Sequence, residues 1–223
     1  MCEYKLYLGD CKTIIPSLSG VDAILADPPY GRNYNPKRGG DSRRRFMRGI
    51  EIFDPKFDQI VGEDTPFDPS HLLGFDIVCL WGANHFADKL PSRSGWFIWD
   101  KRYGVTSNDQ SDCEMAWTNR NKAARIYRQL WNGIIREGIE NNMISGEKLH
   151  PHQKPEALMK WCLEQLKIDP GMTVLDPYMG SGTTGVACLK MGVSFIGCEI
   201  DKKYFDVAEA RLEKASKWIP LGI

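Results

Sequence analysis

The sequence lacks a net charge and has no long apolar run. Its 29 Lys and Arg residues equal its 29 Asp and Glu residues, so the chain is not a polycation that would coat nucleic acid over its whole surface. No segment approaches the ~18 consecutive apolar residues that a membrane span needs. The first residues also lack the charged segment and apolar run of a signal peptide. We therefore expect a cytoplasmic protein that has no membrane partner.

The cysteines do not have the spacing of a disulfide framework or a zinc site. There are seven of them, an odd number, and they are widely spaced without any C-x-x-C pair. Zinc sites and disulfide-rich domains both show closer and paired spacings. We therefore expect reduced thiols and no bound metal.

The 223 residues, of which 42% are hydrophobic, suffice for the core of a single domain spanning residues 1–223. Segments typical of strands alternate with segments typical of helices. This alternation predicts a doubly wound, mostly parallel α/β sheet. The expected strands cover residues 4–8, 21–26, 75–81, 96–101, 113–118, 173–175 and 194–199. The expected helices cover residues 13–18, 84–90, 155–166, the residues from the glycine-rich turn to 191, and those from 201 onward.

Two stretches do not follow this alternation. Residues 31–70 are rich in Gly, Pro, Arg and Asp and show little periodicity, which is typical of a functional or mobile loop. Residues 119–149 mix basic residues with glycines, and the boundaries of their elements stay open. The first stretch carries a basic cluster that consists of Lys37, Arg38, Arg43, Arg44, Arg45 and Arg48.

The motif Asp27-Pro28-Pro29-Tyr30 follows an apolar segment of the kind that forms a buried parallel strand. The prolines end this strand, because neither can donate a hydrogen bond to a sheet and Pro29 keeps Pro28 extended. An acidic side chain, a rigid turn and an aromatic ring are thus expected at the carboxyl end of a strand. Open α/β sheets bind their ligands at that edge.

A second Asp-Pro turn, Asp176-Pro177, follows the strand at 173–175 and leads into a glycine-rich segment at 180–185. Two further acidic residues, Asp10 and Glu199, also stand at the ends of expected strands. Because parallel strands end at a common edge, these features predict one cleft that holds two ligands.

The combination of D-P-P-Y with the glycine-rich turn resembles the amino-directed, S-adenosylmethionine-dependent nucleic-acid methyltransferases. In that family D-P-P-Y is the catalytic motif, and the glycine-rich turn holds the cofactor. The resemblance implies a Rossmann-like methyltransferase sheet with a circularly permuted motif order, in which the catalytic half comes first. It extends to residues 150–155, His-Pro-His-Gln-Lys-Pro, which look like the family's H-P-x-Q-K-P segment.

The resemblance also implies which residues contact S-adenosylmethionine. Asp176 and the segment Gly180-Ser181-Gly182 would face the methionine part of the cofactor, and Lys154 belongs to the segment beside it. Glu199 would bind the ribose hydroxyls, Ile200 would lie beside the adenine ring, and Asp10 would contact the adenine amino group.

The glycine pattern with Glu199 also satisfies the fingerprint of nicotinamide dinucleotide enzymes. Glycines let the backbone approach a ligand, and an acidic side chain accepts hydrogen bonds from the ribose of any adenosine cofactor. However, only one helix follows Glu199, so the remaining strand has to come from the start of the chain. This permuted order favours the methyltransferase family, and the absence of G-K-[ST] after the glycines excludes a P-loop.

The resemblance supplies a mechanism for Asp27 and Pro28. An exocyclic amino group on adenine or cytosine is a poor nucleophile, because its lone pair is delocalised into the ring. If the Asp27 carboxylate and the Pro28 carbonyl each accept one N–H, the lone pair is freed to attack the methyl group. The base has to leave the duplex to be reached, and Tyr30 is the expected stacking partner, worth ~1–3 kcal/mol.

The expected substrate is DNA, with RNA not excluded. Asp27 in the first motif position favours adenine-N6 by resemblance, since cytosine-N4 enzymes more often carry Ser there. The basic cluster lies next to Tyr30 in the sequence and is expected to grip phosphates, and residues 119–149 are a candidate target-recognition segment. The alternatives that remain open are a cytosine-N4 or RNA enzyme, an NAD-dependent oxidoreductase and a catalytically idle nucleic-acid-binding partner. A homodimer and a bacterial or phage origin remain further expectations.

Overall fold

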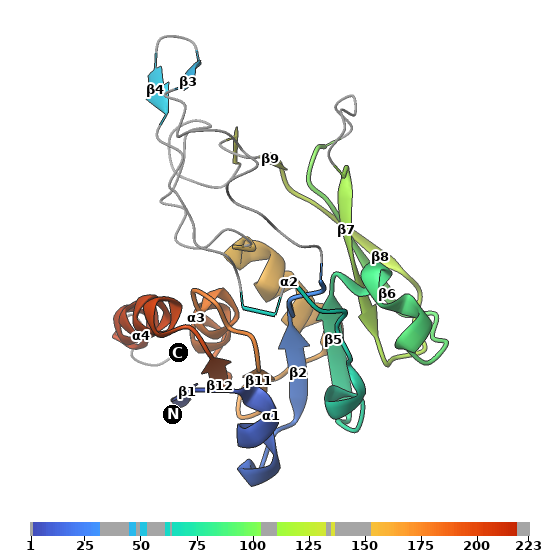
Figure 1. Cartoon of the computed structure of the whole chain (residues 1–223), viewed down its shortest axis with the longest axis vertical. Coiled ribbons are helices and arrows are strands. Elements are labelled where there is room, and N and C mark those ends of the chain that lie inside the picture. The colour runs from blue at the N-terminus through green and yellow to red at the C-terminus, as the bar shows by residue number, and fades with distance from the viewer. Residues whose placement is uncertain are drawn as a thin grey trace.

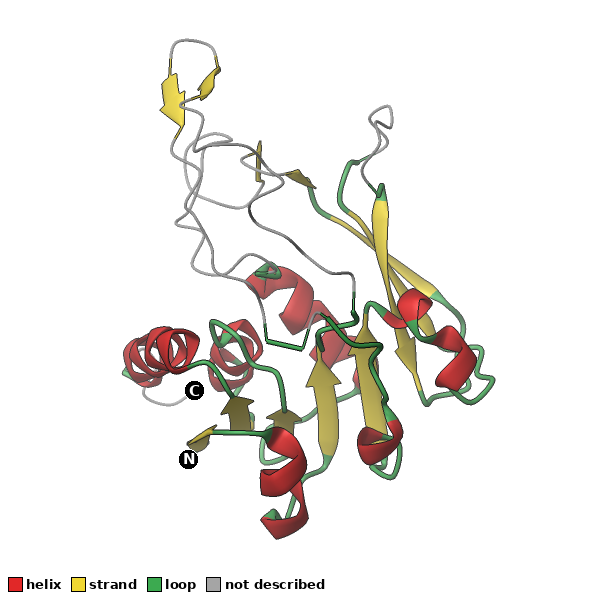
Figure 2. Ribbon diagram, in the orientation of Figure 1, coloured by secondary structure: helices red, strands yellow, loops and turns green. Residues whose placement is uncertain are grey.

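The computed structural model is centred on an eight-stranded sheet that contains all seven expected strands and one further strand, β8 (Figures 1 and 2). It describes residues 2–31, 45–47, 50–52, 61–62, 64–103, 111–132, 135–136 and 153–217. The sheet has the order β1-β12-β11-β2-β5-β7-β6-β8. In that order the strands are Tyr4–Leu8, Ser194–Glu199, Thr173–Asp176, Ala23–Ala26, Ile77–Trp81, Cys113–Thr118, Trp96–Asp100 and Arg125–Arg128.

The first five strands in this order are parallel to one another, namely β1, β12, β11, β2 and β5. The next strand, β7, runs antiparallel to both of its neighbours. The outer pair, β6 and β8, is parallel. Two short hairpins lie outside the sheet, β3 (Arg45–Met47) with β4 (Ile50–Ile52), and β9 (Trp131–Asn132) with β10 (Ile135–Arg136). The largely parallel sheet confirms the predicted fold class.

Helices cover both faces of the parallel strands, as the continuous apolar composition of those strands requires. One face packs against α2 (Glu156–Leu166), α3 (Thr183–Lys190) and α4 (Lys202–Ser216), which contribute Leu163, Ala187 and Leu212 to the core. The other face packs against α1 (Cys11–Ile14) and short 3₁₀ turns that include η3 (Ser70–Leu72). Figure 1 shows α3 and α4 side by side near β12.

Two predicted helices are wrong in detail. The expected helix at 13–18 is α1 followed by a 3₁₀ turn, η1 (Ile15–Ser17), because Pro16 has no N–H to continue an α-helix. The expected helix at 84–90 consists of two 3₁₀ turns, η4 (Ala83–His85) and η5 (Ala87–Lys89). Phe86 separates them with a φ of −139° and a ψ of 30°, which are not helical, and its ring is buried in the core.

The order of the chain along the sheet is the predicted permutation. The strand β11, which carries the glycine-rich turn, pairs with β2, which carries Asp27, and β1 closes the far edge beside β12. In the part of the chain that the structure describes, no helix is both long enough and apolar enough to cross a membrane.

Candidate active site

Four acidic residues from different strands meet at one edge of the sheet. Asp10 follows β1, Glu199 ends β12, Asp176 ends β11 and Asp27 follows β2. All four strands are parallel, so their carboxyl ends point to the same side. The arrowheads of β2 and β5 mark this direction in Figure 1.

Two adjoining pockets open at this edge. The larger has a volume of about 260 Å³ and the smaller about 40 Å³. Asp27, Tyr178 and Gly180 line both pockets, so the D-P-P-Y turn and the glycine-rich turn share one cleft. The larger pocket also contains the predicted residues Asp10, Pro28, Pro29, Glu199 and Ile200, and the smaller contains Lys154, Asp176 and Ser181.

Asp27 is bound to Lys154, a contact that the sequence did not predict. The Lys154 ammonium contacts Oδ2 of Asp27, and it also lies 3.0 Å from Oε2 of Glu114 in β7. Only 7% of the Lys154 side chain is exposed. Burial by itself would lower the pKa of Lys154, but the two carboxylates outweigh it and raise the pKa above its ordinary value. Lys154 is therefore a fixed positive charge beside the D-P-P-Y turn.

Asp176 is a buried carboxyl at the junction of the two Asp-Pro turns. Its Oδ2 accepts a hydrogen bond from the Thr184 hydroxyl at 2.7 Å, and its Oδ1 accepts one from the amide of Tyr178 at 3.1 Å. Burial raises the pKa of Asp176 to about 7, although these two hydrogen bonds lower it. The ionised form is thus costly in the ligand-free protein and would be favoured by a cation bound nearby.

Glu199 and Asp10 form the opposite end of the larger pocket. Glu199 accepts hydrogen bonds from the amides of Gly180 and Asp201, each at 2.9 Å. Burial raises the pKa of Glu199, and these amide donors partly offset that effect. Asp10 caps α1 by accepting from the amide of Lys12 at 2.9 Å. Beside them the exposed Ile200, at 51% exposure, offers an apolar surface to a flat ring.

The glycine-rich turn also has a role in packing. Gly182 begins α3 with a left-handed φ of 76°, and a Cβ there would lie 2.7 Å from Leu212 of α4. Gly182 lines neither pocket. Ser181 lines the smaller pocket, and its hydroxyl accepts from Arg211 of α4 at 3.1 Å.

Tyr30 lies outside both pockets and is stacked on His85, with ring centroids 4.6 Å apart and an interplanar angle of 9°. The Tyr30 ring lies over Gly82, where a Cβ would come within 2.3 Å of it. The stack shows that His85 supports the aromatic residue of the D-P-P-Y motif.

The basic cluster lies outside the described residues, except for Arg45, of which only the strand β3 is described. His150 and His152 of the H-P-x-Q-K-P segment also lie outside the described residues, as does most of 133–149. Within the described ranges, no group of three or more His, Cys, Asp and Glu side chains could hold a metal ion.

The permuted sheet, with two Asp-Pro turns sharing a cleft at its carboxyl edge, is the architecture of a Rossmann-like methyltransferase. A family model described as DNA methylase, N6_N4_Mtase, matches residues 82–210. The type II methyltransferase M.HinfI of Haemophilus influenzae is 47% identical, over an alignment that covers 92% of this chain and 67% of that protein. The chain therefore belongs to the N6_N4_Mtase family of DNA methylases, and the predicted family is confirmed.

Solved structures show the same fold. The complex of M1.HpyAVI with SAM has a TM-score of 0.54 at 24% identity, covering 94% of this chain and 98% of that one. The cytosine-N4-specific PvuII DNA methyltransferase has a TM-score of 0.56 at 13% identity, covering 97% of this chain and 91% of that one. At these identities the similarity concerns the fold of the sheet.

Proposed function

We propose that this protein transfers a methyl group from S-adenosylmethionine to the N6 atom of an adenine flipped out of DNA. The observation that carries the proposal is the shared cleft. Asp27 lines the same two pockets as Gly180, and the smaller pocket also contains Asp176. A base held by the first motif would therefore lie next to a cofactor held by the second. Membership of the DNA methylase family supports this assignment.

The residues of the cleft fit S-adenosylmethionine. The carboxylates of Glu199 and Asp10 are suited to the ribose hydroxyls and the adenine amino group, and Ile200 is suited to the adenine ring. Asp176 is suited to the ammonium of the methionine part, and Gly180 has no side chain to obstruct it. When bound, the cofactor supplies an electrophilic methyl group on a positively charged sulfur.

The chain's own contribution is to orient and activate the amino group. The Asp27 carboxylate and the Pro28 carbonyl would each accept one N–H, which frees the nitrogen lone pair. That lone pair would form the new N–C bond to the methyl group, whose former bonding electrons would stay on the sulfur of the cofactor, and the proton lost from the nitrogen would pass to the Asp27 carboxylate or to water. Fixing two reactants in line supplies much of the rate enhancement.

Adenine is proposed over cytosine because Asp27 occupies the first position of the motif. Cytosine-N4 is the second candidate for the target atom. It is retained because a cytosine-N4-specific enzyme has the same fold. The basic cluster next to Tyr30 is proposed to bind DNA phosphates, with Tyr30 stacking on the flipped base.

Product analysis tests this proposal. The protein is incubated with methyl-labelled S-adenosylmethionine and unmethylated duplex DNA, and the DNA is digested to nucleosides. The proposal predicts label in N6-methyldeoxyadenosine. Label in N4-methyldeoxycytidine would overturn the base assignment, label only in RNA would overturn the substrate, and no transfer to either would overturn the activity.

A further inference from the structure

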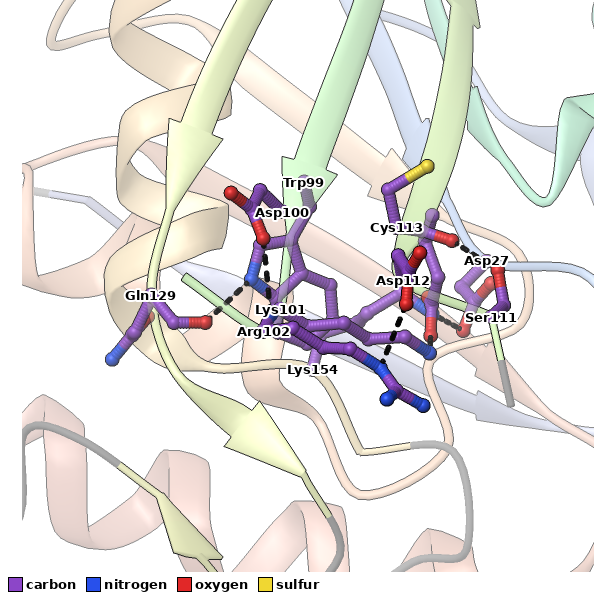
Figure 3. A network of polar contacts seen from close by, with 11 residues as sticks. Asp27, Trp99, Asp100, Lys101, Arg102, Ser111, Asp112, Cys113, Gln129 and Lys154 are labelled. Carbon is purple, nitrogen blue, oxygen red and sulfur yellow. Dashed lines mark hydrogen bonds and ion pairs between the residues drawn. The ribbon is translucent and has the colours of Figure 1, made fainter. Parts of the chain in front are cut away.

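Lys154 is buried between two carboxylates that come from opposite halves of the sheet. Asp27 follows β2 in the parallel half, and Glu114 lies in the antiparallel strand β7. Because β7 runs antiparallel to β5, its first residues lie at the edge where the parallel strands end. Figure 3 shows Lys154 and Asp27 within the surrounding network of polar contacts. The ammonium therefore connects the D-P-P-Y turn to a strand that carries neither of the two Asp-Pro motifs.

The charges alternate along this contact chain. Lys101, just after β6, lies 2.8 Å from Oε1 of Glu114, and the other oxygen of Glu114 faces Lys154. Burial by itself would raise the pKa of Glu114, but Lys154 and Lys101 outweigh it and lower the pKa to about 2. Glu114 is thus a carboxylate at every pH at which the protein would work. The Trp81 ring also faces Lys154, with its centroid 5.9 Å from the ammonium nitrogen.

This arrangement affects how strongly Asp27 can accept a hydrogen bond. If a buried ammonium had Asp27 as its only carboxylate partner, its positive charge would largely cancel the charge of that carboxylate. The carboxylate is then a weaker acceptor for a substrate amino group, because its charge is already neutralised. A second carboxylate on the same ammonium, here Glu114, offsets part of the positive potential at Asp27 and also fixes the position of the ammonium.

We propose that Glu114 is a positioning residue for methyl transfer, which shares Lys154 with Asp27 so that Asp27 keeps a fixed orientation and its capacity to accept the N–H of the target base. The inference rests on the proposed function, since it assigns to Glu114 a part in the same reaction. Glu114 itself acts through Lys154 and touches no reacting atom.

The variant Glu114→Gln tests this role, because it keeps the size of the side chain and removes its charge. We expect kcat to fall by about tenfold or more per folded molecule, while KM for DNA and Kd for S-adenosylmethionine stay within about twofold. Glu114→Asp, which keeps the charge, should recover part of the loss. Melting temperatures give the folded fraction, and assays are run well below the lowest of them.

The matched control is Asp112→Asn. It removes a carboxylate that lies 3.1 Å from the buried Arg102, two residues away from Glu114 in the same segment. It should cost stability but leave kcat per folded molecule unchanged. If Asp112→Asn lowers kcat as much as Glu114→Gln, the loss reflects general damage to this edge, and the inference is wrong.

The pH dependence of kcat separates positioning from a purely structural role. Lys154→Gln removes the cation between two carboxylates, so the acid limb of its profile should move to higher pH. Glu114→Gln leaves that cation with Asp27 as its carboxylate partner. The plateau value of kcat in this variant should therefore fall, while the acid limb of its pH profile does not move to higher pH. A wild-type kcat in Glu114→Gln, or an acid limb that moves to higher pH in it, would overturn the inference. A wild-type protein that transfers no methyl group would overturn the proposed function itself, and this role of Glu114 with it.

Discussion

At the scale of single residues, the ligand-free cleft contains a carboxyl group, that of Asp176, whose burial disfavours its ionised form. Asp176 has a pKa of about 7 because it is buried, with hydrogen bonds from Thr184 and Tyr178 that only partly compensate. A positively charged methionine ammonium would favour its ionised form. Cofactor binding and the ionisation of Asp176 are therefore expected to be linked.

The first prediction concerns the affinity for S-adenosylmethionine. Between pH 6 and pH 8 the fraction of ionised Asp176 rises about tenfold, so the Kd should fall by up to about that factor. Asp176→Asn should bind more weakly and lack this part of the pH dependence. Isothermal titration calorimetry at several pH values measures both. The cofactor's own amine titrates equally in both proteins. If their plots of Kd against pH are parallel, Asp176 does not contribute to the pH dependence, and its assignment to the methionine ammonium is contradicted.

The same pKa shift predicts how the ligand-free protein responds to pH. The folded-state pKa of Asp176 lies above the ordinary value of 3.8. Its contribution to stability is therefore fully present below pH 3.8 and is lost as the pH rises through about 7. The melting temperature of the wild type should therefore fall more steeply between pH 4 and pH 7 than that of Asp176→Asn, and the two should run parallel above about pH 8. Saturating S-adenosylmethionine should reduce the difference.

His85 is predicted to support the stacking function of Tyr30. Aromatic pairs of this kind are worth about 0.5–1.5 kcal/mol, so His85→Ala should raise the KM for DNA by about twofold to tenfold. His85→Phe retains a flat ring and should restore it. A 2-aminopurine at the target position should report less base flipping in the Ala variant. Equal fluorescence in all three proteins would remove His85 from this role.

At the scale of elements, the start of α3 packs closely against α4. Gly182 combines a left-handed φ with close contact to Leu212 and Ala208 of α4. Gly20 has a similar φ of 70° but no atom within 4 Å of the position of a Cβ. Comparing alanine substitutions at Gly20 and Gly182 therefore separates the cost of backbone strain from the cost of steric overlap.

We predict that Gly20→Ala costs about 1 kcal/mol of folding free energy, through backbone strain alone. Gly182→Ala should cost a further 1–3 kcal/mol, approximately, because α4 would have to move. Urea unfolding monitored by circular dichroism measures both. Equal losses would show that α4 adapts without cost.

Sequence reasoning worked best where the positions of residues depend on strand ends. Asp10, Asp27, Asp176 and Glu199 were expected at one edge because parallel strands share that edge, and the structure places them there. It failed for Glu114, because its contact with Lys154 depends on β7 pairing between β5 and β6. No local pattern gives the position of an antiparallel strand in a mixed sheet. His85 was missed because it lies in a 3₁₀ turn where a longer helix was expected.

At the scale of the whole molecule, the neutral chain concentrates six basic residues between positions 37 and 48, shortly after the D-P-P-Y motif in the sequence. Each phosphate contact contributes about −0.9 to the slope of log K against log salt for duplex DNA. Replacing Arg43, Arg44 and Arg45 together by Gln should weaken binding to all sequences and reduce the size of the slope by up to about 3. Fluorescence anisotropy at several salt concentrations measures it. An unchanged slope would place these arginines outside the interface.

The central claim is that the D-P-P-Y turn performs the transfer and the glycine-rich turn holds the cofactor in one cleft. Asp27→Ala tests it most directly, with binding of S-adenosylmethionine and methyl transfer to duplex DNA measured on the same sample. The account predicts that transfer is lost while the variant still binds the cofactor. Retained turnover by Asp27→Ala would contradict it.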